Sequence, residues 1–345
     1  MHIFQNRILT KLIKYQIKAL CNSSHLREHN LKPPWKILFF GTDEFSLASL
    51  KALHSEYRKG DLLNKLEVVT SLKNKKNAVC KFASKEQLVV YNWPISSPEC
   101  HGFHVGLVVS FGHLIPKDII TAFPLGMLNV HASLLPRWRG AAPIIYALAN
   151  GDKKTGVTIM KIKPDKFDIG EIVTQASVDI PDDTKMPDLY HTLAILGAQT
   201  LVEVLDNLPA NLNSAVPQSE NGITFAPRID SKIAYVDWQR MSAKDVYNLQ
   251  RAIMGMFHLT TKFNNIPIKL YDIHKSNKIV VDNCEDNIKP GSVVYDKKHK
   301  TLQIQCADGN WIMVKTIGVP GKRMSAADFN NGFVSKQTQK LVVFR

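Results

Sequence analysis

Two polar residues separated by one position, Asn129 and His131, are the strongest candidates for chemistry in this sequence of 345 residues. Residues two apart on a strand project from the same face, so both side chains would leave a strand end together. An amide that donates hydrogen bonds, placed beside a titratable imidazole, can stabilise an oxyanion and move a proton. A single histidine at a strand end is more often structural, so the spacing alone leaves both interpretations open.

A second polar cluster offers a carboxylate to this histidine. It covers residues 161–170 and follows the next apolar segment of the chain. Loops at the C-terminal ends of neighbouring parallel strands converge on one crevice, so we expect Asp168 to reach His131 and fix its orientation. The alternative for Asp168 is a turn residue before Gly170, and Asp165 is a competing candidate for the same role.

The elements that would position these residues follow an α/β pattern. A short apolar run at 36–40 precedes Gly41 and a 3.6-residue periodicity, which predicts a buried strand turning into a helix capped by Thr42. The expected further strands are 66–72, 107–111, 127–131 and 157–160, with helices between several of them and a long helix over 186–205. This alternation predicts a doubly wound, mostly parallel, Rossmann-like sheet.

The first strand-to-helix turn argues against a dinucleotide cofactor. It carries no GxGxxG motif, and Asp43 and Glu44 stand where a pyrophosphate would meet the helix N-terminus. Two carboxylates at that position would repel phosphate groups.

The C-terminal part of the chain has a different pattern. Short alternating strands are expected at 261–263, 268–273, 291–295, 301–306 and 311–317. Short strands separated by turns are typical of a small β-barrel. We therefore expect a catalytic domain over 34–207, a linker over 208–220 and a barrel domain over 221–345.

Charge is unevenly distributed along the sequence, whose net charge is +14. Residues 1–34 carry six basic groups and one acid, residues 35–213 carry 19 and 18, and residues 214–345 carry 19 and 11. The C-terminal excess suits a polyanion such as the phosphates of a nucleic acid, or else a solubilising surface.

The first segment has the pattern of an amphipathic, acid-poor helix. Its basic and apolar faces consist of Lys11, Lys14 and Lys18, and of Ile13, Ile17 and Leu20. This pattern predicts a mitochondrial transit peptide over residues 1–33, and the alternative is a surface helix or a tail.

Composition excludes several classes of protein. No stretch approaches the ~18 consecutive apolar residues of a membrane helix, so we expect no membrane partner. The five cysteines form no CxxC pair or Cys/His cluster, which argues against a metal site and favours free thiols in a reducing compartment.

Longer motifs around these residues make a resemblance specific. Residues 129–140 read NVHASLLPRWRG, and Asp168 lies two residues before Gly170. Residues 39–45 read FFGTDEF, and residues 321–329 read GKRMSAADF. Together these motifs resemble the folate-dependent formyltransferase family over about residues 35–335.

The resemblance implies transfer of a formyl group from 10-formyltetrahydrofolate to the α-amino group of methionine esterified to initiator tRNA. It implies that Asn129 holds the formyl oxygen, that His131 helps to move the proton and that Asp168 supports His131. The residues expected to contact the folate are Phe111, Gly112, Leu114, Ile115, Ser133, Leu134, Pro136 and Asp165. No metal is implied.

The same resemblance assigns the C-terminal region to a tRNA-binding barrel of the OB type. The residues expected to contact tRNA are Lys73, Lys75, Lys76, Arg137, Arg139, Lys322 and Arg323. For Arg137 and Arg139 the alternative is structural pairing around Trp138. With the leader, the resemblance places a monomer in the mitochondrial matrix.

Two alternatives remain at this point. A formyltransferase acting on a small amine, or a formyltetrahydrofolate hydrolase, would share the catalytic residues, but a small substrate gives no reason for a basic second domain. A protein of a different class, a catalytically inactive tRNA binder, is disfavoured because Asn129, His131 and Asp168 are all present.

Overall fold

The computed structural model describes residues 31–73, 77–276, 288–337 and 342–345. Residues 1–30 of the predicted transit peptide, together with Lys75, Lys76, Cys21 and Cys284, therefore lie outside the described residues. The chain forms two compact units. Unit 1 comprises the chain up to Arg139 with 156–177 and 191–225, and unit 2 comprises 140–155, 178–190 and 226–345.

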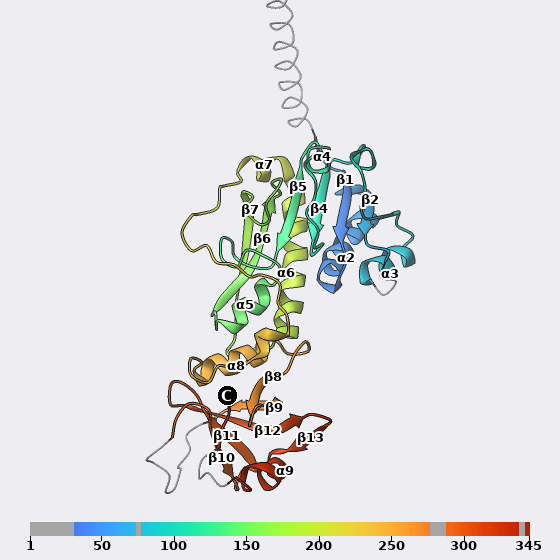
Figure 1. The fold of residues 1–345 in the computed structure, drawn as a ribbon. Coiled ribbons are helices and arrows are strands. Elements are labelled where there is room, and N and C mark those ends of the chain that lie inside the picture. The colour runs from blue at the N-terminus through green and yellow to red at the C-terminus, as the bar shows by residue number, and fades with distance from the viewer. Residues whose placement is uncertain (1–30, 74–76, 277–287, 338–341) are drawn as a thin grey trace, which may run out of the picture. The chain divides into compact units, whose positions relative to one another are not determined.

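A seven-stranded sheet forms the framework of the N-terminal half (Figure 1). Its strands are β1 (Trp35–Gly41), β2 (Leu63–Thr70), β3 (Val90–Asn92), β4 (Val105–Val109), β5 (Met127–His131), β6 (Lys154–Lys161) and β7 (Ile172–Asp179), in the order β3-β2-β1-β4-β5-β6-β7. Strands β1 to β5 are parallel, and β1 and β4 are almost completely buried. This confirms the predicted doubly wound, mostly parallel sheet.

Strand β6 runs antiparallel to β5, which the sequence did not indicate. In this register His131 faces Thr158 and Leu128 faces Lys161, so β6 ends beside the start of β5. The expected meeting of Asp168 and His131 at a shared C-terminal edge was therefore wrong, because β5 and β6 end at opposite edges of the sheet. Residues 162–171 instead fold back to bring Asp168 to His131.

The helices of this half are α2 (Glu44–Lys59), α3 (Ala78–Lys85), α4 (Lys117–Ile120), α5 (Pro143–Ala149), α6 (Met186–Asp206) and α7 (Leu208–Asn213). The cap of α2 is Asp43 and not Thr42 as predicted. Asp43 accepts a hydrogen bond from the Ser46 backbone N–H at 3.0 Å, while the Ser46 hydroxyl accepts from the Asp43 N–H. The Thr42 hydroxyl instead donates to the carbonyl of Ser110 at 3.0 Å.

A second, antiparallel sheet lies in unit 2. Its strands are β8 (Leu259–Phe263), β9 (Ile266–Lys275), β10 (Ser292–Asp296), β11 (Thr301–Gln305), β12 (Trp311–Val319), β13 (Lys322–Ser325) and β14 (Val342–Val343). Reciprocal backbone hydrogen bonds between Lys262 and Arg345 join its two ends at 2.7 and 2.9 Å. A sheet curled in this way confirms the predicted barrel.

Two helices of unit 2, α8 (Ala243–Ala252) and α9 (Ala326–Phe329), were not predicted. In the predicted linker, α7 occupies 208–213, and an extended segment follows it. The domain boundaries inferred from the sequence stay predictions. None of the helices in the described ranges has both the length and the apolar character needed to cross a membrane.

Three cysteines lie in the described part of the chain, and all three are free thiols, as predicted for them. Burial raises the pKa of the Cys100 thiol to about 11 and that of Cys306 to about 12. Both are buried and remain protonated at neutral pH, which makes them packing residues.

Trp35 ties the start of the sheet to the end of the long helix. Its side chain is fully buried, and its indole N–H donates to the Leu205 carbonyl at 2.7 Å. Leu205 lies in the last turn of α6, where carbonyls have no partner within the helix.

We expect Trp35→Phe to lower the free energy of unfolding by about 1–3 kcal/mol, because a buried carbonyl loses its donor. Chemical denaturation measures this change. Tyr57→Phe, which removes a hydroxyl from an exposed aromatic side chain, is the control. Equal stability of the two variants would contradict the importance of this hydrogen bond.

Candidate active site

The site is built on the last residues of β5. Asn129 and His131 project from the same face of the strand, because both lie within it and one residue separates them. His131 is 6% exposed, whereas Asn129 is half-buried. Within the described residues, the Asn129 side chain has no hydrogen-bond partner, so its amide is available to a ligand.

His131 is held between two oxygen atoms. Its Nε2 lies 2.9 Å from the Trp138 carbonyl, and its Nδ1 lies 3.5 Å from Oδ1 of Asp168. A carbonyl can only accept, so Nε2 carries a hydrogen and donates it. In the neutral ring, Nδ1 is then left with its lone pair.

The loop that carries Asp168 depends on an unusual backbone. Asp168 has a φ of 56°, in the left-handed region, which Asp tolerates better than most residues. At Gly170 an added Cβ would lie 1.6 Å from the Lys161 carbonyl oxygen. Only glycine allows this close approach, and it brings the loop back toward His131.

Charge also stabilises the base of this loop. Lys161 donates to Glu171 at 2.9 Å, and Lys163 lies 3.9 Å from the same carboxylate. The hydrogen bond from Lys161 is the main cause that lowers the pKa of Glu171.

The loop between β5 and α5 is held from inside by hydroxyl groups. Ser133 is buried and donates to the Arg137 carbonyl at 2.6 Å, while Thr158 donates to the Ser133 carbonyl. The Ser133 hydroxyl, expected at the folate, is thus used within the protein. Leu134 and Pro136 are half-buried, and Asp165 is exposed.

The other segment expected at the folate, 111–115, follows β4 and Ser110. Ser110 and Gly112 both have positive φ, and the Ser110 hydroxyl donates to the Asp43 carboxylate at 2.6 Å. Phe111 and Ile115 are each 4% exposed and belong to the core, whereas Leu114 is 49% exposed. Of these three side chains only Leu114 is open to a ligand.

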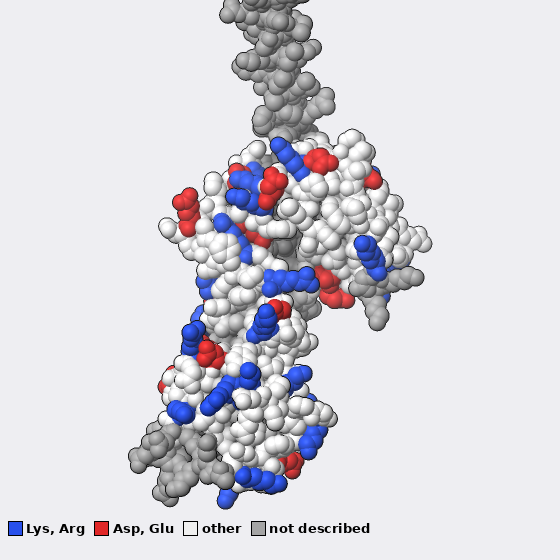
Figure 2. Space-filling view, viewed as in Figure 1, with Lys and Arg blue, Asp and Glu red and all other residues white. Residues whose placement is uncertain are grey.

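The basic residues expected at tRNA lie in both units. Lys73 is exposed in unit 1, and Lys322 and Arg323 are exposed on β13 of unit 2. The Arg323 guanidinium lies 4.0 Å from the centre of the Tyr271 ring. On the face shown in Figure 2, Lys and Arg side chains are spread over the surface of the barrel.

The two arginines beside Trp138 have partners within the protein. Arg137 stacks on the Trp138 ring at 4.2 Å. Arg139 donates from Nε and Nη2 to the side-chain oxygen of Gln218 at 3.0 and 2.6 Å. Gln218 was missed in the sequence, where it stands in a polar segment without a periodic pattern.

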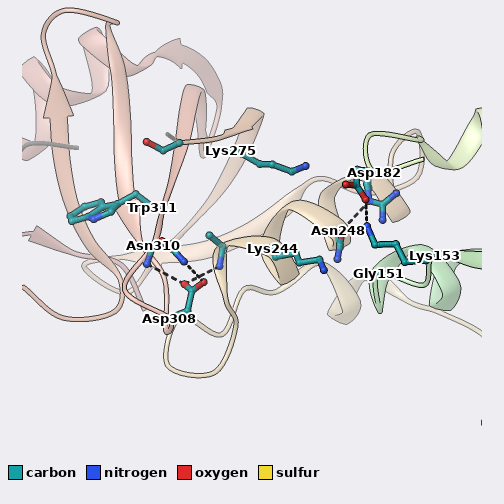
Figure 3. Close-up of a pocket in the computed structure, with 12 residues that line it drawn as sticks. Gly151, Lys153, Asp182, Lys244, Asn248, Lys275, Asp308, Asn310 and Trp311 are labelled. Atoms are coloured by element: carbon teal, nitrogen blue, oxygen red, sulfur yellow. Dashed lines mark hydrogen bonds and ion pairs between the residues drawn. The ribbon is translucent and has the colours of Figure 1, made fainter. Parts of the chain in front are cut away.

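A cavity of about 370 Å³ lies wholly within unit 2, between α8 and the barrel (Figure 3). Four of its lining residues are basic: Lys153, Lys244, Arg251 and Lys275. Lys153 pairs with Asp182, Lys275 pairs with Asp183, and Arg251 donates to backbone carbonyls. Carboxylates thus pair with two of these four cations, and no chemistry is assigned to the cavity. In the described part of the chain, no group of His, Cys, Asp and Glu side chains could hold a metal ion.

Comparison with known proteins identifies the class that this fold and site define. The family model for formyl transferases matches residues 98–205, and the model for the formyl transferase C-terminal domain matches residues 228–334. The human mitochondrial methionyl-tRNA formyltransferase is 40% identical over 328 residues, covering 93% of this chain and 82% of the relative. The chain belongs to the methionyl-tRNA formyltransferase family.

Further relatives support this membership. The mitochondrial enzyme of Rattus norvegicus is 41% identical, covering 92% of this chain and 83% of its own. The bacterial enzyme of Fusobacterium nucleatum is 29% identical, covering 89% of this chain and 99% of the relative.

Solved structures share the fold at low identity. An N-formyltransferase from Helicobacter canadensis, solved with folinic acid and an amino sugar nucleotide, has a TM-score of 0.62 at 16% identity, covering 81% of this chain and 98% of its own. The sugar 3N-formyl transferase WlaRD, solved in the presence of 5-N-formyl-tetrahydrofolate, has a TM-score of 0.60 at 17% identity, covering 84% and 100%.

Replacing Gly170 tests the folded-back loop. We expect Gly170→Ala to lower the free energy of unfolding by about 1–3 kcal/mol, because the new methyl group would overlap the Lys161 carbonyl. Gly332→Ala is the control, since nothing lies within 4 Å of a Cβ added there. If Gly170→Ala unfolded at the same denaturant concentration as this control, the described loop path would be wrong.

Proposed function

We propose that this protein transfers the formyl group of 10-formyltetrahydrofolate to the α-amino group of Met-tRNA, giving formylmethionyl-tRNA for translation initiation. The observation that carries the proposal is the half-buried Asn129 amide, without a partner in the described residues, beside the buried His131–Asp168 pair. Family membership supplies the substrates.

The residues fit the chemistry of formyl transfer. The donor supplies a formyl carbon, and attack by an amine places negative charge on its oxygen and positive charge on the nitrogen. The Asn129 amide can donate to the oxygen as this charge develops. Collapse of the tetrahedral intermediate then breaks the bond between the formyl carbon and N10 of the folate, and tetrahydrofolate leaves with the proton lost by the attacking nitrogen on N10. No covalent bond to the protein is needed.

His131 then removes the proton from the attacking nitrogen. Its Nε2–H donates to the Trp138 carbonyl, so Nδ1, which keeps its lone pair, is the ring atom that accepts the proton. Protonation at Nδ1 creates an imidazolium facing the Asp168 carboxylate, which stabilises the new charge. The resting separation of 3.5 Å is longer than a hydrogen bond and tightens when charge appears.

The folate would lie along the loops after β4 and β5. Exposed Leu114 and half-buried Leu134 and Pro136 offer apolar contacts, and exposed Asp165 stands three residues before Asp168. The positive φ of Gly112 allows the backbone to approach a ligand closely.

Unit 2 would hold the tRNA. The charge excess of residues 214–345 suits phosphates, and Arg323 stacked on Tyr271 joins a cation to an aromatic platform. Lys322 and Lys73 would add contacts to the phosphate backbone. The leader would direct a monomer to the mitochondrial matrix. Relatives named as mitochondrial support the organelle.

The test is formyl transfer by protein lacking residues 1–33, with 10-formyltetrahydrofolate and Met-tRNA. Free methionine, an amino sugar nucleotide and deacylated tRNA serve as comparison substrates. We expect formylation of Met-tRNA alone. Formylation of the amino sugar, or loss of formyl groups to water, would favour the small-amine transferase or the hydrolase, and tRNA binding without turnover would favour the inactive binder.

Replacing the histidine separates chemistry from binding. We expect His131→Ala to lower kcat by about 100-fold or more, because general base catalysis is lost, while the Kd for Met-tRNA stays within about twofold. Initial rates measure kcat, and filter binding measures the Kd for Met-tRNA. Parallel losses of affinity and rate would show that His131 is a structural residue.

A further inference from the structure

The side chain of Gln218 forms a bridge between two loops of the site. Its oxygen accepts two hydrogen bonds from Arg139, and its Nε2 donates to the carbonyls of Asp168 and Gly170, both at 2.9 Å. The amide thereby uses both its donor and its acceptor capacity. All four residues belong to unit 1.

The backbone around Gln218 reinforces this bridge. Val216 exchanges two hydrogen bonds with Ile172, just after the Asp168 loop, at 2.8 and 2.9 Å. Further along, the Thr224 hydroxyl accepts from the Trp138 N–H at 2.8 Å, and its carbonyl accepts from the Arg139 N–H at 2.9 Å. Residues 216–224, here named the strap, are therefore attached at one end to the Asp168 loop and at the other to the Trp138 loop.

These two loops supply the two oxygen atoms that hold His131. Trp138 contributes the carbonyl facing Nε2, and Asp168 contributes the carboxylate facing Nδ1. Asp168 also adopts a left-handed backbone, a conformation that persists only when its surroundings enforce it. The two hydrogen bonds from Gln218, to the carbonyls of Asp168 and Gly170, supply that constraint.

We propose that Gln218 and Arg139 are positioning residues for formyl transfer, fixing Asp168 against His131 without touching a substrate. This inference rests on the proposed function. It assigns to Arg139 a role inside the protein in place of the tRNA contact expected from the sequence. It also assigns a function to a segment whose composition suggested only a linker.

The test compares Gln218→Met, Gln218→Glu, Arg139→Ala and the Arg139→Ala/Gln218→Met double variant. Methionine keeps the volume of glutamine and removes all four hydrogen bonds. Glutamate keeps the partner of Arg139 but loses both donors to the Asp168 loop. Glu220→Ala, at an exposed position of the strap, is the matched control.

The measurements are kcat, the KM for Met-tRNA and the thermal midpoint, with rates taken below the midpoint of every variant. We expect each Gln218 variant and Arg139→Ala to lose about 10- to 100-fold in kcat, since small misplacements of a catalytic group are costly. The KM for Met-tRNA should stay within about twofold, and the double variant should be no slower than the slower single variant.

Three results would overturn the inference. They are an unchanged kcat in both Gln218 variants, a raised KM for Met-tRNA with normal kcat in Arg139→Ala, and losses that multiply in the double variant. The first two assign Gln218 to packing and Arg139 to tRNA. Wild-type protein without formyl transfer would refute the proposed function itself, whereas active wild type with active variants would refute only the positioning role.

Discussion

The site depends on one contact, the buried approach of the Asp168 carboxylate to the His131 imidazole. Burial of a carboxylate beside a histidine is favourable only when both are held with partners. The fold meets this condition by fixing each partner separately. His131 ends a strand paired on both sides and faces the Trp138 carbonyl, while Asp168 is carried by a loop that folds back from β6.

This arrangement explains several local features that are unfavourable alone. The left-handed φ of Asp168 and the close approach at Gly170 are the backbone conditions for returning the loop to the end of β5. Thr158, opposite His131 in the register, also anchors the Ser133 loop. A polar core position therefore connects both sides of the site.

The division of charge follows the same logic. Formyl transfer needs a buried, rigid set of polar groups, whereas a nucleic acid needs an exposed cationic surface. The polar groups of the candidate site lie within residues 35–213, a part of the chain that is almost neutral. Residues 214–345, which include the barrel, carry the excess of basic residues that the proposed tRNA contact requires.

Much of the fold could be predicted because local residue patterns determine many of its strands and helices. The bounds of β5 were predicted correctly at 127–131, and α6 at 186–205 differs by one residue from the helix observed. The direction of β6 could not be predicted, because a buried strand has the same composition in either orientation. The cap at Asp43 was missed since Thr and Asp are both good caps and they are neighbours in the sequence, so residue type does not distinguish them.

The candidate site shows the same division. Asn129, His131 and Asp168 were predicted from residue types and a family resemblance, and the structure brings His131 and Asp168 together. The burial of Phe111 and Ile115 was not foreseen, because alternation within a loop does not reveal which side chains enter the core. Gln218 could not be identified from the sequence, since its partners lie far away along the chain and two of them are backbone carbonyls.

The central claim, that His131 and Asp168 act as one unit in proton transfer, is tested most directly by a double-mutant cycle on kcat. The cycle consists of wild type, His131→Ala, Asp168→Asn and the double variant, with Met-tRNA saturating. We predict that adding Asp168→Asn to His131→Ala costs less than about twofold, because the carboxylate acts only through the imidazole. If the double variant loses as large a factor in kcat relative to His131→Ala as Asp168→Asn loses relative to wild type, the two residues act independently. That result would contradict the account.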